Sequence, residues 1–137
     1  MKHLLKLSLV FIVFFSCSKE EEISINGVLD FSNDTITFDT VFASIGSITK
    51  TLTIYNNNEE DIYSNISIRG NSAANFRMNI DGVSGNSQNN VFIPKNDSIF
   101  IFIEVTVDPS SNTTPYILSV SLLFETGSNL QSVKLVA

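Results

Sequence analysis

Apolar and polar residues alternate with a period of two in several short segments after residue 22, and loops rich in Asn, Asp, Gly and Ser separate them. The clearest segment runs from Ser98 to Val107, where every second residue is apolar. This period predicts strands with one buried face, because an amphipathic helix would repeat about every 3.6 residues. We expect strands at residues 35–38, 47–55, 62–69, 76–80, 91–93, 98–107, 116–124 and 131–136.

The alternation also predicts which side chains face the core. In the segment 98–107, the apolar side chains at odd positions should point inward and Phe100 and Phe102 outward, so this strand belongs in the middle of an antiparallel sheet. In the segment 47–55, we expect Ile48, Leu52 and Ile54 to point inward.

The turn chemistry and the strand spacing together predict an all-β domain. Residues 56–61 and 126–129 carry Asn, Asp and Gly, which tolerate the backbone geometry of tight turns. Seven to eight short strands at these spacings indicate an immunoglobulin-like antiparallel β-sandwich, and a small barrel is the alternative. The chain has no Trp and no cysteine pair, so it is not an antibody-type domain.

The N-terminal 22 residues follow a different pattern. Lys2 and Lys6 give a basic start, and the apolar run from Leu4 to Phe15 is shorter than the roughly 20 residues that span a bilayer. A basic flank before a short apolar run is typical of a cleaved secretory signal. Ser16 precedes Cys17, the one cysteine. The segment resembles a bacterial lipoprotein signal, which implies cleavage before Cys17 and acylation of its thiol, with palmitate among the acyl chains. An ordinary signal peptide is the alternative.

The residues after Cys17 bear on the location of the protein. Ser18, Lys19, Glu20, Glu21 and Glu22 form a short polar and acidic cluster. This cluster resembles the surface-export signal of lipoproteins from Bacteroidota, which implies an outer-membrane protein that faces the cell surface. The alternative is a solvated tether on a protein that faces the periplasm, since charged segments stay extended in water.

The expected processing gives a signal peptide at residues 1–16, an acylated cysteine and acidic tether at residues 17–27, and one domain at residues 28–137. The chain has 8 Lys and Arg against 14 Asp and Glu, so loss of Lys2 and Lys6 with the signal leaves 6 against 14, a net charge of −8. An acidic domain disfavours nucleic acid and anionic membrane surfaces as partners. We expect membrane attachment through the lipid alone, and an unknown protein or glycan as partner.

Candidate catalytic chemistry is sparse after the signal. The one histidine, His3, leaves with the signal, and the one cysteine is acylated, which excludes Ser–His–Asp, Cys–His and histidine–metal arrangements. A carboxylate pair could hydrolyse glycosides. The candidate carboxylates sit mostly at expected strand ends and loops: Asp81, Asp97, Glu104, Asp108 and Glu125. We therefore expect neither an enzyme nor a cofactor.

One loop offers weak candidates for ligand binding. Asn58, Glu59, Glu60 and Asp61 supply oxygen atoms of the kind that Ca²⁺ prefers, but their spacing does not match a known calcium loop. We expect no metal there and a solvated hairpin loop instead. Tyr55 and Tyr63 flank this loop; they would either stack on a sugar or cap a sheet edge.

A set of short motifs occurs in a recognisable order. They are Phe38-Asp39-Thr40-Val41-Phe42, Ile54-Tyr55-Asn56-Asn57-Asn58, Phe76-Arg77-Met78-Asn79-Ile80-Asp81-Gly82, Ile93-Pro94-Lys95-Asn96-Asp97-Ser98-Ile99 and Val107-Asp108-Pro109. Over residues 36–136, the order resembles immunoglobulin-like modules related to ASH and major sperm protein domains, found in choice-of-anchor bacterial surface proteins. The chain also resembles the N-terminal module of larger Bacteroidota lipoproteins, which implies either a stand-alone module or a truncated member.

The expected function follows from the signal and this resemblance. We expect a non-enzymatic, lipid-anchored cell-envelope protein that acts as an interaction, spacer or assembly module at the outer membrane. A glycan- or calcium-binding surface module is the alternative.

Overall fold

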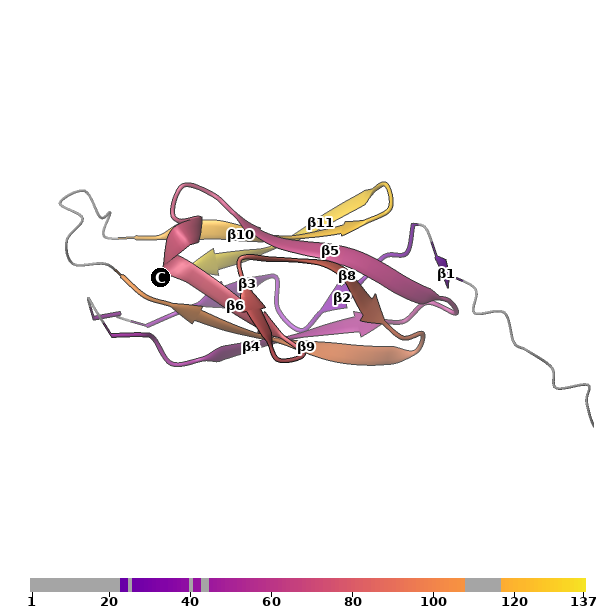
Figure 1. Ribbon diagram of the computed structural model, residues 1–137, viewed down its shortest axis with the longest axis horizontal. Helices are drawn as coiled ribbons and strands as arrows, with labels where there is room; N and C mark the ends of the chain where they lie inside the picture. Colours follow the sequence, from indigo (N-terminus) through magenta and orange to yellow (C-terminus); the bar gives the residue numbers. More distant parts are fainter. Residues whose placement is uncertain (1–22, 25, 40, 43–44, 108–116) are drawn as a thin grey trace, which may run out of the picture.

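The computed structural model describes residues 23–24, 26–39, 41–42, 45–107 and 117–137, which form two stacked sheets (Figure 1). The six-stranded sheet has the order β1 (Ile23–Ser24), β5 (Asp61–Arg69), β10 (Ser119–Thr126), β11 (Asn129–Val136) and β3 (Thr35–Thr37), and β8 (Ser87–Ile93) also pairs with β5. The five-stranded sheet has the order β2 (Asp30–Phe31), β4 (Lys50–Asn56), β9 (Asp97–Val105), β6 (Phe76–Ile80) and β7 (Val83–Gly85). A 3-10 turn, η2 (Ala73–Asn75), precedes β6. The predicted all-β sandwich is confirmed.

The core lies between the sheets and is built by the period-two alternation. In β9, Ile101, Ile103 and Val105 are fully buried, whereas Phe100 and Phe102 are exposed on the outer face. β9 pairs with β4 on one side and β6 on the other, as expected for a central antiparallel strand. Each large apolar side chain that is fully buried contributes roughly 1.5–3 kcal/mol, so this alternation is the main source of stability.

Three sequence-based expectations are corrected. Seven to eight strands were expected, but the described residues form a six-stranded and a five-stranded sheet, because β1, β2 and β7 are too short to show a period. The sandwich is not purely antiparallel, since β1 pairs with β5 and β3 with β11 in parallel. Ile48 is 66% exposed, because β4 begins only at Lys50 and the alternation before it is not strand pairing.

Two hairpins and one glycine have backbone geometry that the sequence requires. Asp81 and Gly82 join β6 to β7, and both have positive φ angles, which is typical of a tight two-residue hairpin turn. Gly127 also has a positive φ in the hairpin between β10 and β11. Gly70 has a φ of +138°, and a Cβ atom there would lie 3.2 Å from Cγ1 of Val120. The turn predicted at residues 126–129 is confirmed.

Several predicted features lie outside the described residues. They are the signal with Cys17, the export cluster Ser18–Glu22, the motif residues Thr40, Asp108 and Pro109, and Tyr116. In the part of the chain that the structure describes, no helix has the length and apolar character needed to cross a membrane.

Candidate functional site

Asn56 organises the loop at residues 56–61, where the sequence suggested calcium. Its side chain is fully buried at the end of β4. Its Nδ2 donates to the carbonyl oxygens of Glu60 (2.9 Å) and Ile93 (3.0 Å), and its Oδ1 accepts from the backbone N–H and the side-chain Nδ2 of Asn58 (3.0 and 2.8 Å). All of the hydrogen-bonding capacity of this amide is therefore used inside the protein.

Two of the weak metal candidates, Asn58 and Asp61, also bond to backbone groups. Asn58 donates through Nδ2 to the carbonyl oxygen of Val28 (2.8 Å), and Asp61 Oδ1 accepts from the backbone N–H of Lys95 (2.8 Å). Within the described ranges, no group of three or more His, Cys, Asp and Glu residues could hold a metal ion. The geometry assigns this loop a structural role.

The two tyrosines that flank this loop do not form one platform. Tyr55 lies on the outer face of β4, and Tyr63 on the outer face of β5, which belongs to the other sheet. Tyr63 packs instead against Phe92, with ring centroids 5.1 Å apart. Because the outer faces of a sandwich point in opposite directions, both rings cannot stack on the same small sugar.

The candidate carboxylates are also dispersed. Asp81 lies in the β6–β7 turn, Asp97 begins β9, and Glu125 lies on β10 in the other sheet. Asp97 Oδ1 accepts the backbone N–H of Ser98 (2.7 Å), and Glu104 Oε1 accepts the hydroxyl of Thr49 (2.8 Å). These contacts explain the positions of Asp97 and Glu104 structurally; Asp108 lies outside the described residues.

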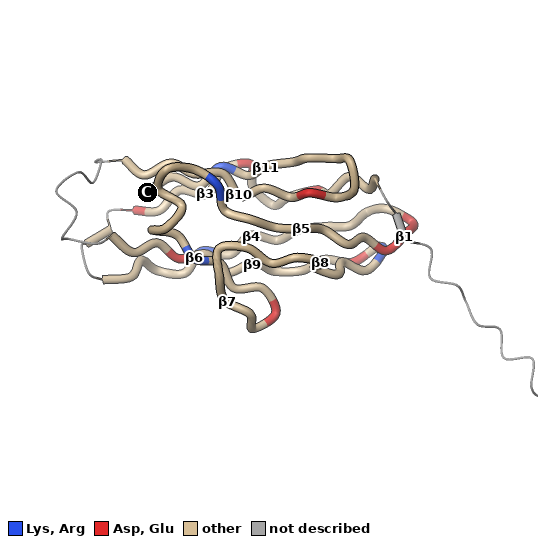
Figure 2. Tube along the Cα trace, turned by 45° about the horizontal axis from the view of Figure 1, so that its top comes forward, with Lys and Arg blue, Asp and Glu red and all other residues tan. Residues whose placement is uncertain are grey.

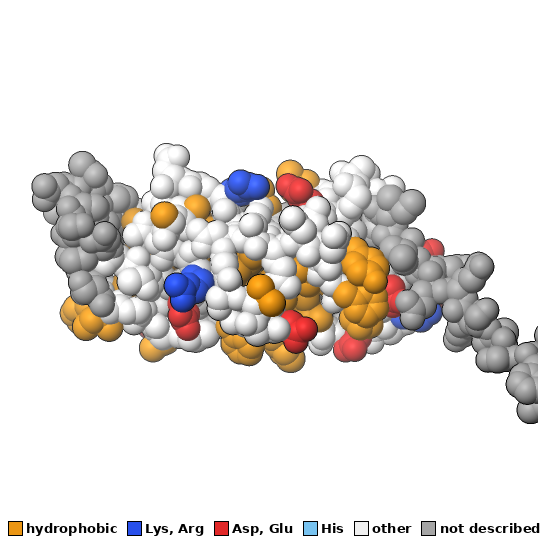
Figure 3. Space-filling model, viewed as in Figure 1, with side chains coloured by type: hydrophobic (Ala, Val, Ile, Leu, Met, Phe, Trp, Pro, Cys, Tyr) orange, Lys and Arg blue, Asp and Glu red, His pale blue; other side chains and the backbone are white. Residues whose placement is uncertain are grey.

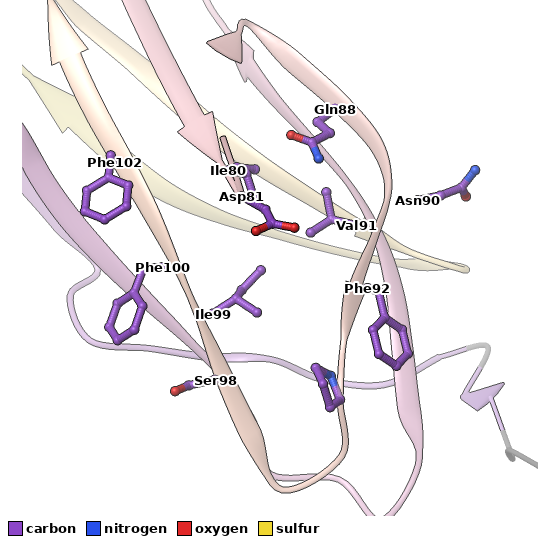
Figure 4. A pocket seen from close by; sticks show the side chains of 11 residues that line it. Ile80, Asp81, Gln88, Asn90, Val91, Phe92, Ser98, Ile99, Phe100 and Phe102 are labelled. Carbon is purple, nitrogen blue, oxygen red and sulfur yellow. The ribbon is translucent and has the colours of Figure 1, made fainter. Parts of the chain in front are cut away.

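A groove with a volume of about 620 Å³ lies between an edge of β8 in one sheet and β9 in the other. It is lined by the end of β6, by β8 and by β9 (Figure 4). Its apolar lining residues include Val91, Phe92, Ile99 and Phe100. Figure 3 shows apolar side chains gathered over β8 and β9 with acidic side chains among them. We refer to this feature as the β8–β9 groove.

Three phenylalanines of the groove stand out because they remain in contact with solvent. Phe92, Phe100 and Phe102 have exposed fractions of 42%, 53% and 44%. Phe100 and Phe102 lie on the outer face of β9, whereas Phe92 on β8 packs against Tyr63 of the other sheet. The groove is therefore flanked by exposed aromatic side chains of both sheets, and exposed apolar patches often mark interaction sites.

An incomplete strand pairing creates the groove. β6 pairs with β9 only from Val105 to Ile101, and its last residue, Ile80, lies opposite Ile101. The chain then turns away at Asp81 and Gly82 into β7, which pairs with the other edge of β6. In Figure 2, the β6–β7 hairpin projects from the sandwich and carries an acidic residue near its tip. Within the described residues, no strand therefore pairs with the first half of β9 on that side, where β8 lies across the groove.

Sequence analysis missed this groove. It placed Phe100 and Phe102 correctly on the outer face of β9 but gave them no function. The sequence feature that could have indicated it is the pair of aromatic residues at outward positions of one strand, together with Phe92 on the strand before it. The end of β6 at Ile80 depends on tertiary pairing, which the local pattern does not show.

Comparisons with known proteins support the fold. No protein-family model matches the sequence, and no curated protein matches it. Among solved structures, the chain is similar to an ASH / PapD-like domain of human CEP192, PapD-like domain 7, with a TM-score of 0.51 and 10% sequence identity over 90% of this chain and 92% of that one. It is also similar to part of a family 123 glycoside hydrolase from Clostridium perfringens, with a TM-score of 0.53 and 10% identity over 75% of this chain and 22% of the hydrolase chain.

The sandwich topology and these similarities define the structural class. The chain has an immunoglobulin-like β-sandwich fold, similar to that of the ASH / PapD-like domain. At identities of 10% the likeness establishes the fold alone, because one sandwich fold carries many unrelated functions.

Proposed function

We propose that this chain is a non-enzymatic protein of the bacterial cell envelope, anchored to the outer membrane by acyl chains on Cys17 and facing the cell surface. Its immunoglobulin-like domain serves as an interaction module, with spacing or assembly as its contribution to a larger complex. The observation that carries the interaction role is the β8–β9 groove, where exposed aromatic side chains line an open hollow.

The anchoring part of the proposal depends on the N-terminal sequence. The apolar run ending at Ser16-Cys17 resembles a lipoprotein signal, and Ser18–Glu22 resembles the surface-export cluster of Bacteroidota lipoproteins. One acyl chain binds a membrane only marginally, whereas several chains on one cysteine hold a domain there stably. The acidic charge of the domain suits a protein that contacts the membrane through its lipid alone.

The non-enzymatic part depends on residue types and on the geometry of the groove. After the expected cleavage the chain has no histidine and no free cysteine. Asp81 is the only charged residue among the eleven described residues that line the groove, so a pair of carboxylates does not converge there. Apolar walls with one carboxylate are suited to binding.

Labelling with radioactive palmitate tests the proposal. Cells that express the whole chain should incorporate label into the protein, and Cys17→Ala should abolish incorporation. Ser18→Ala is the matched control and should retain the label, because it changes the adjacent residue and leaves the thiol. Equal labelling of the wild type and Cys17→Ala would contradict the proposal.

A further inference from the structure

We propose that the β8–β9 groove binds an extended segment of a partner protein, which adds a strand to the unpaired first half of β9 and carries a Lys or Arg beside Asp81. This inference deepens the proposed interaction role and depends on it. Backbone pairing, apolar contacts and charge each support it separately.

The backbone of β9 presents hydrogen-bonding groups toward the groove. The N–H and the C=O of Val105 both bond to Ser47, on the β4 side (3.0 and 2.8 Å), whereas the N–H of Thr106 bonds to the carbonyl of Asn75, next to β6 (2.8 Å). Because successive residues of a strand direct these groups to opposite edges, Phe100 and Ser98 direct theirs to the same edge as Thr106.

These groups lie beyond the last residue of β6. The register of β6 ends at Ile80 opposite Ile101, and β8 lies near β9 without pairing with it, so within the described residues no strand pairs with Phe100 or Ser98 on this edge. The N–H of Ser98 is already bonded to Asp97 Oδ1 (2.7 Å). The N–H and C=O of Phe100 and the C=O of Ser98 therefore remain available to an incoming strand, which is the basis of strand addition at open sheet edges.

The burial pattern along β9 shows the space that such a strand would fill. Ile99 and Ile101 are alternate residues on the same inner face. Ile101, opposite the end of β6, is fully buried, whereas Ile99 is only partly buried and lines the groove. A strand beside residues 98–100 would cover Ile99 with one side chain and contact Phe100 on the outer face with the next. An alternating apolar and polar partner segment fits this arrangement.

The charge around the groove favours a positively charged partner segment. Asp81 lies where β6 ends, at the head of the groove, and is the only charged residue among the described lining residues (Figure 4). The mature chain would carry 14 acidic and 6 basic residues, so an approaching acidic segment would be repelled by the domain as a whole. Complementarity at an interface favours a basic segment and speeds its association.

A peptide selection tests this inference on the full lipidated chain in detergent micelles. A phage-displayed library of random nine-residue peptides is selected against the wild type, and the enriched peptides are synthesised. We expect alternating apolar and polar sequences that contain Lys or Arg. Hydrogen exchange measured by mass spectrometry should be slower at residues 98–100 when peptide is bound.

Matched variants identify the contacts. Methylating the peptide nitrogens that face the carbonyls of Ser98 and Phe100 should weaken binding about thirtyfold, because two backbone hydrogen bonds of about 1 kcal/mol each are lost. Asp81→Asn should weaken binding about threefold at low salt, whereas Asp34→Asn, at the opposite edge of the other sheet, should leave it unchanged. Phe100→Lys should abolish binding, and Leu130→Lys, at another exposed apolar position, on β11, should not.

Three outcomes would overturn the inference: no enrichment of peptides, enriched peptides without basic residues, or binding that protects no amide at residues 98–100. The melting temperatures of Phe100→Lys and Leu130→Lys distinguish a loss of binding from a loss of folding. Failure of the palmitate experiment would remove the anchor but leave peptide binding intact, so the two proposals fail separately.

Discussion

Asn56 and Ile93 connect the two sheets, because the Nδ2 atom of Asn56 on β4 donates a hydrogen bond to the carbonyl oxygen of Ile93 on β8 at 3.0 Å. The same amide holds the loop that follows β4 through Glu60 and Asn58. One side chain thus fixes the end of the sandwich at which β8 turns toward β9, and with it one end of the groove.

Asn56→Ala should therefore lower the free energy of unfolding more than Asn57→Ala does. Its loss leaves the buried carbonyl of Ile93 without this donor and removes the bonds to Glu60 and Asn58, which should cost about 2–4 kcal/mol of unfolding free energy. Asn57→Ala is the control, since exposed Asn57 makes one side-chain bond, to Asp30, and should cost less than about 1 kcal/mol. Urea denaturation measures both; equal losses would contradict the structural role of Asn56.

Calcium should not stabilise the protein. Asn56 Oδ1 and Asp61 Oδ1 both accept N–H bonds, which leaves the loop without a preformed set of cation ligands. The melting temperature should be the same in millimolar CaCl₂ and in EDTA, because only a ligand that binds the folded state raises it. An increase of several degrees that Asp61→Asn removes would show that the loop binds calcium after all.

Gly70 should tolerate no side chain. Its φ of +138° is accessible only to glycine at low cost, and a Cβ atom would meet Val120 at 3.2–3.4 Å. Gly70→Ala should reduce the unfolding free energy by about 2–4 kcal/mol. Gly46→Ala is the comparison, since its Cβ atom would lie 3.7 Å from Oγ1 of Thr106 at an ordinary contact distance. A Gly70→Ala protein as stable as Gly46→Ala would show that the backbone relaxes at this position.

The central strands could be predicted from sequence because burial and alternation coincide there. Ile101, Ile103 and Val105 follow a strict period of two, and both faces of β9 were predicted correctly. The exposure of Ile48 was not predicted correctly. The alternation in the sequence extends back to Ile48, but the pairing of β4 with β9 begins only at Lys50. Local sequence gives the period, whereas the partner strand sets its limits.

The remaining differences have the same origin. β2 and β7 have two and three residues, so only their neighbours in space define them. The groove arises because β6 ends opposite Ile101. The sequence around Phe100 does not indicate where its neighbouring strand ends. The structural role of Asn56 could not be predicted either, because a run of asparagines has the same sequence whether its side chains are solvated or buried.

The acidic cluster after Cys17 should control display on the surface. Replacing Lys19, Glu20, Glu21 and Glu22 by alanine should keep the acylated protein in the outer membrane but reduce its digestion by protease added to intact cells. Replacing Glu59 and Glu60 in the folded domain by alanine removes two acidic side chains but keeps the hydrogen bonds between Asn56 and Asn58, so it serves as the control. Equal digestion of the wild type and the cluster variant would make residues 18–22 a simple tether.

Intact-mass analysis of the protein purified from the cell envelope tests the central claim most directly. The account predicts a chain that begins at Cys17, without residues 1–16, and whose mass is increased by the acyl groups on that residue. A chain that retains its apolar leader, or an unacylated form recovered from the culture medium, would contradict the account.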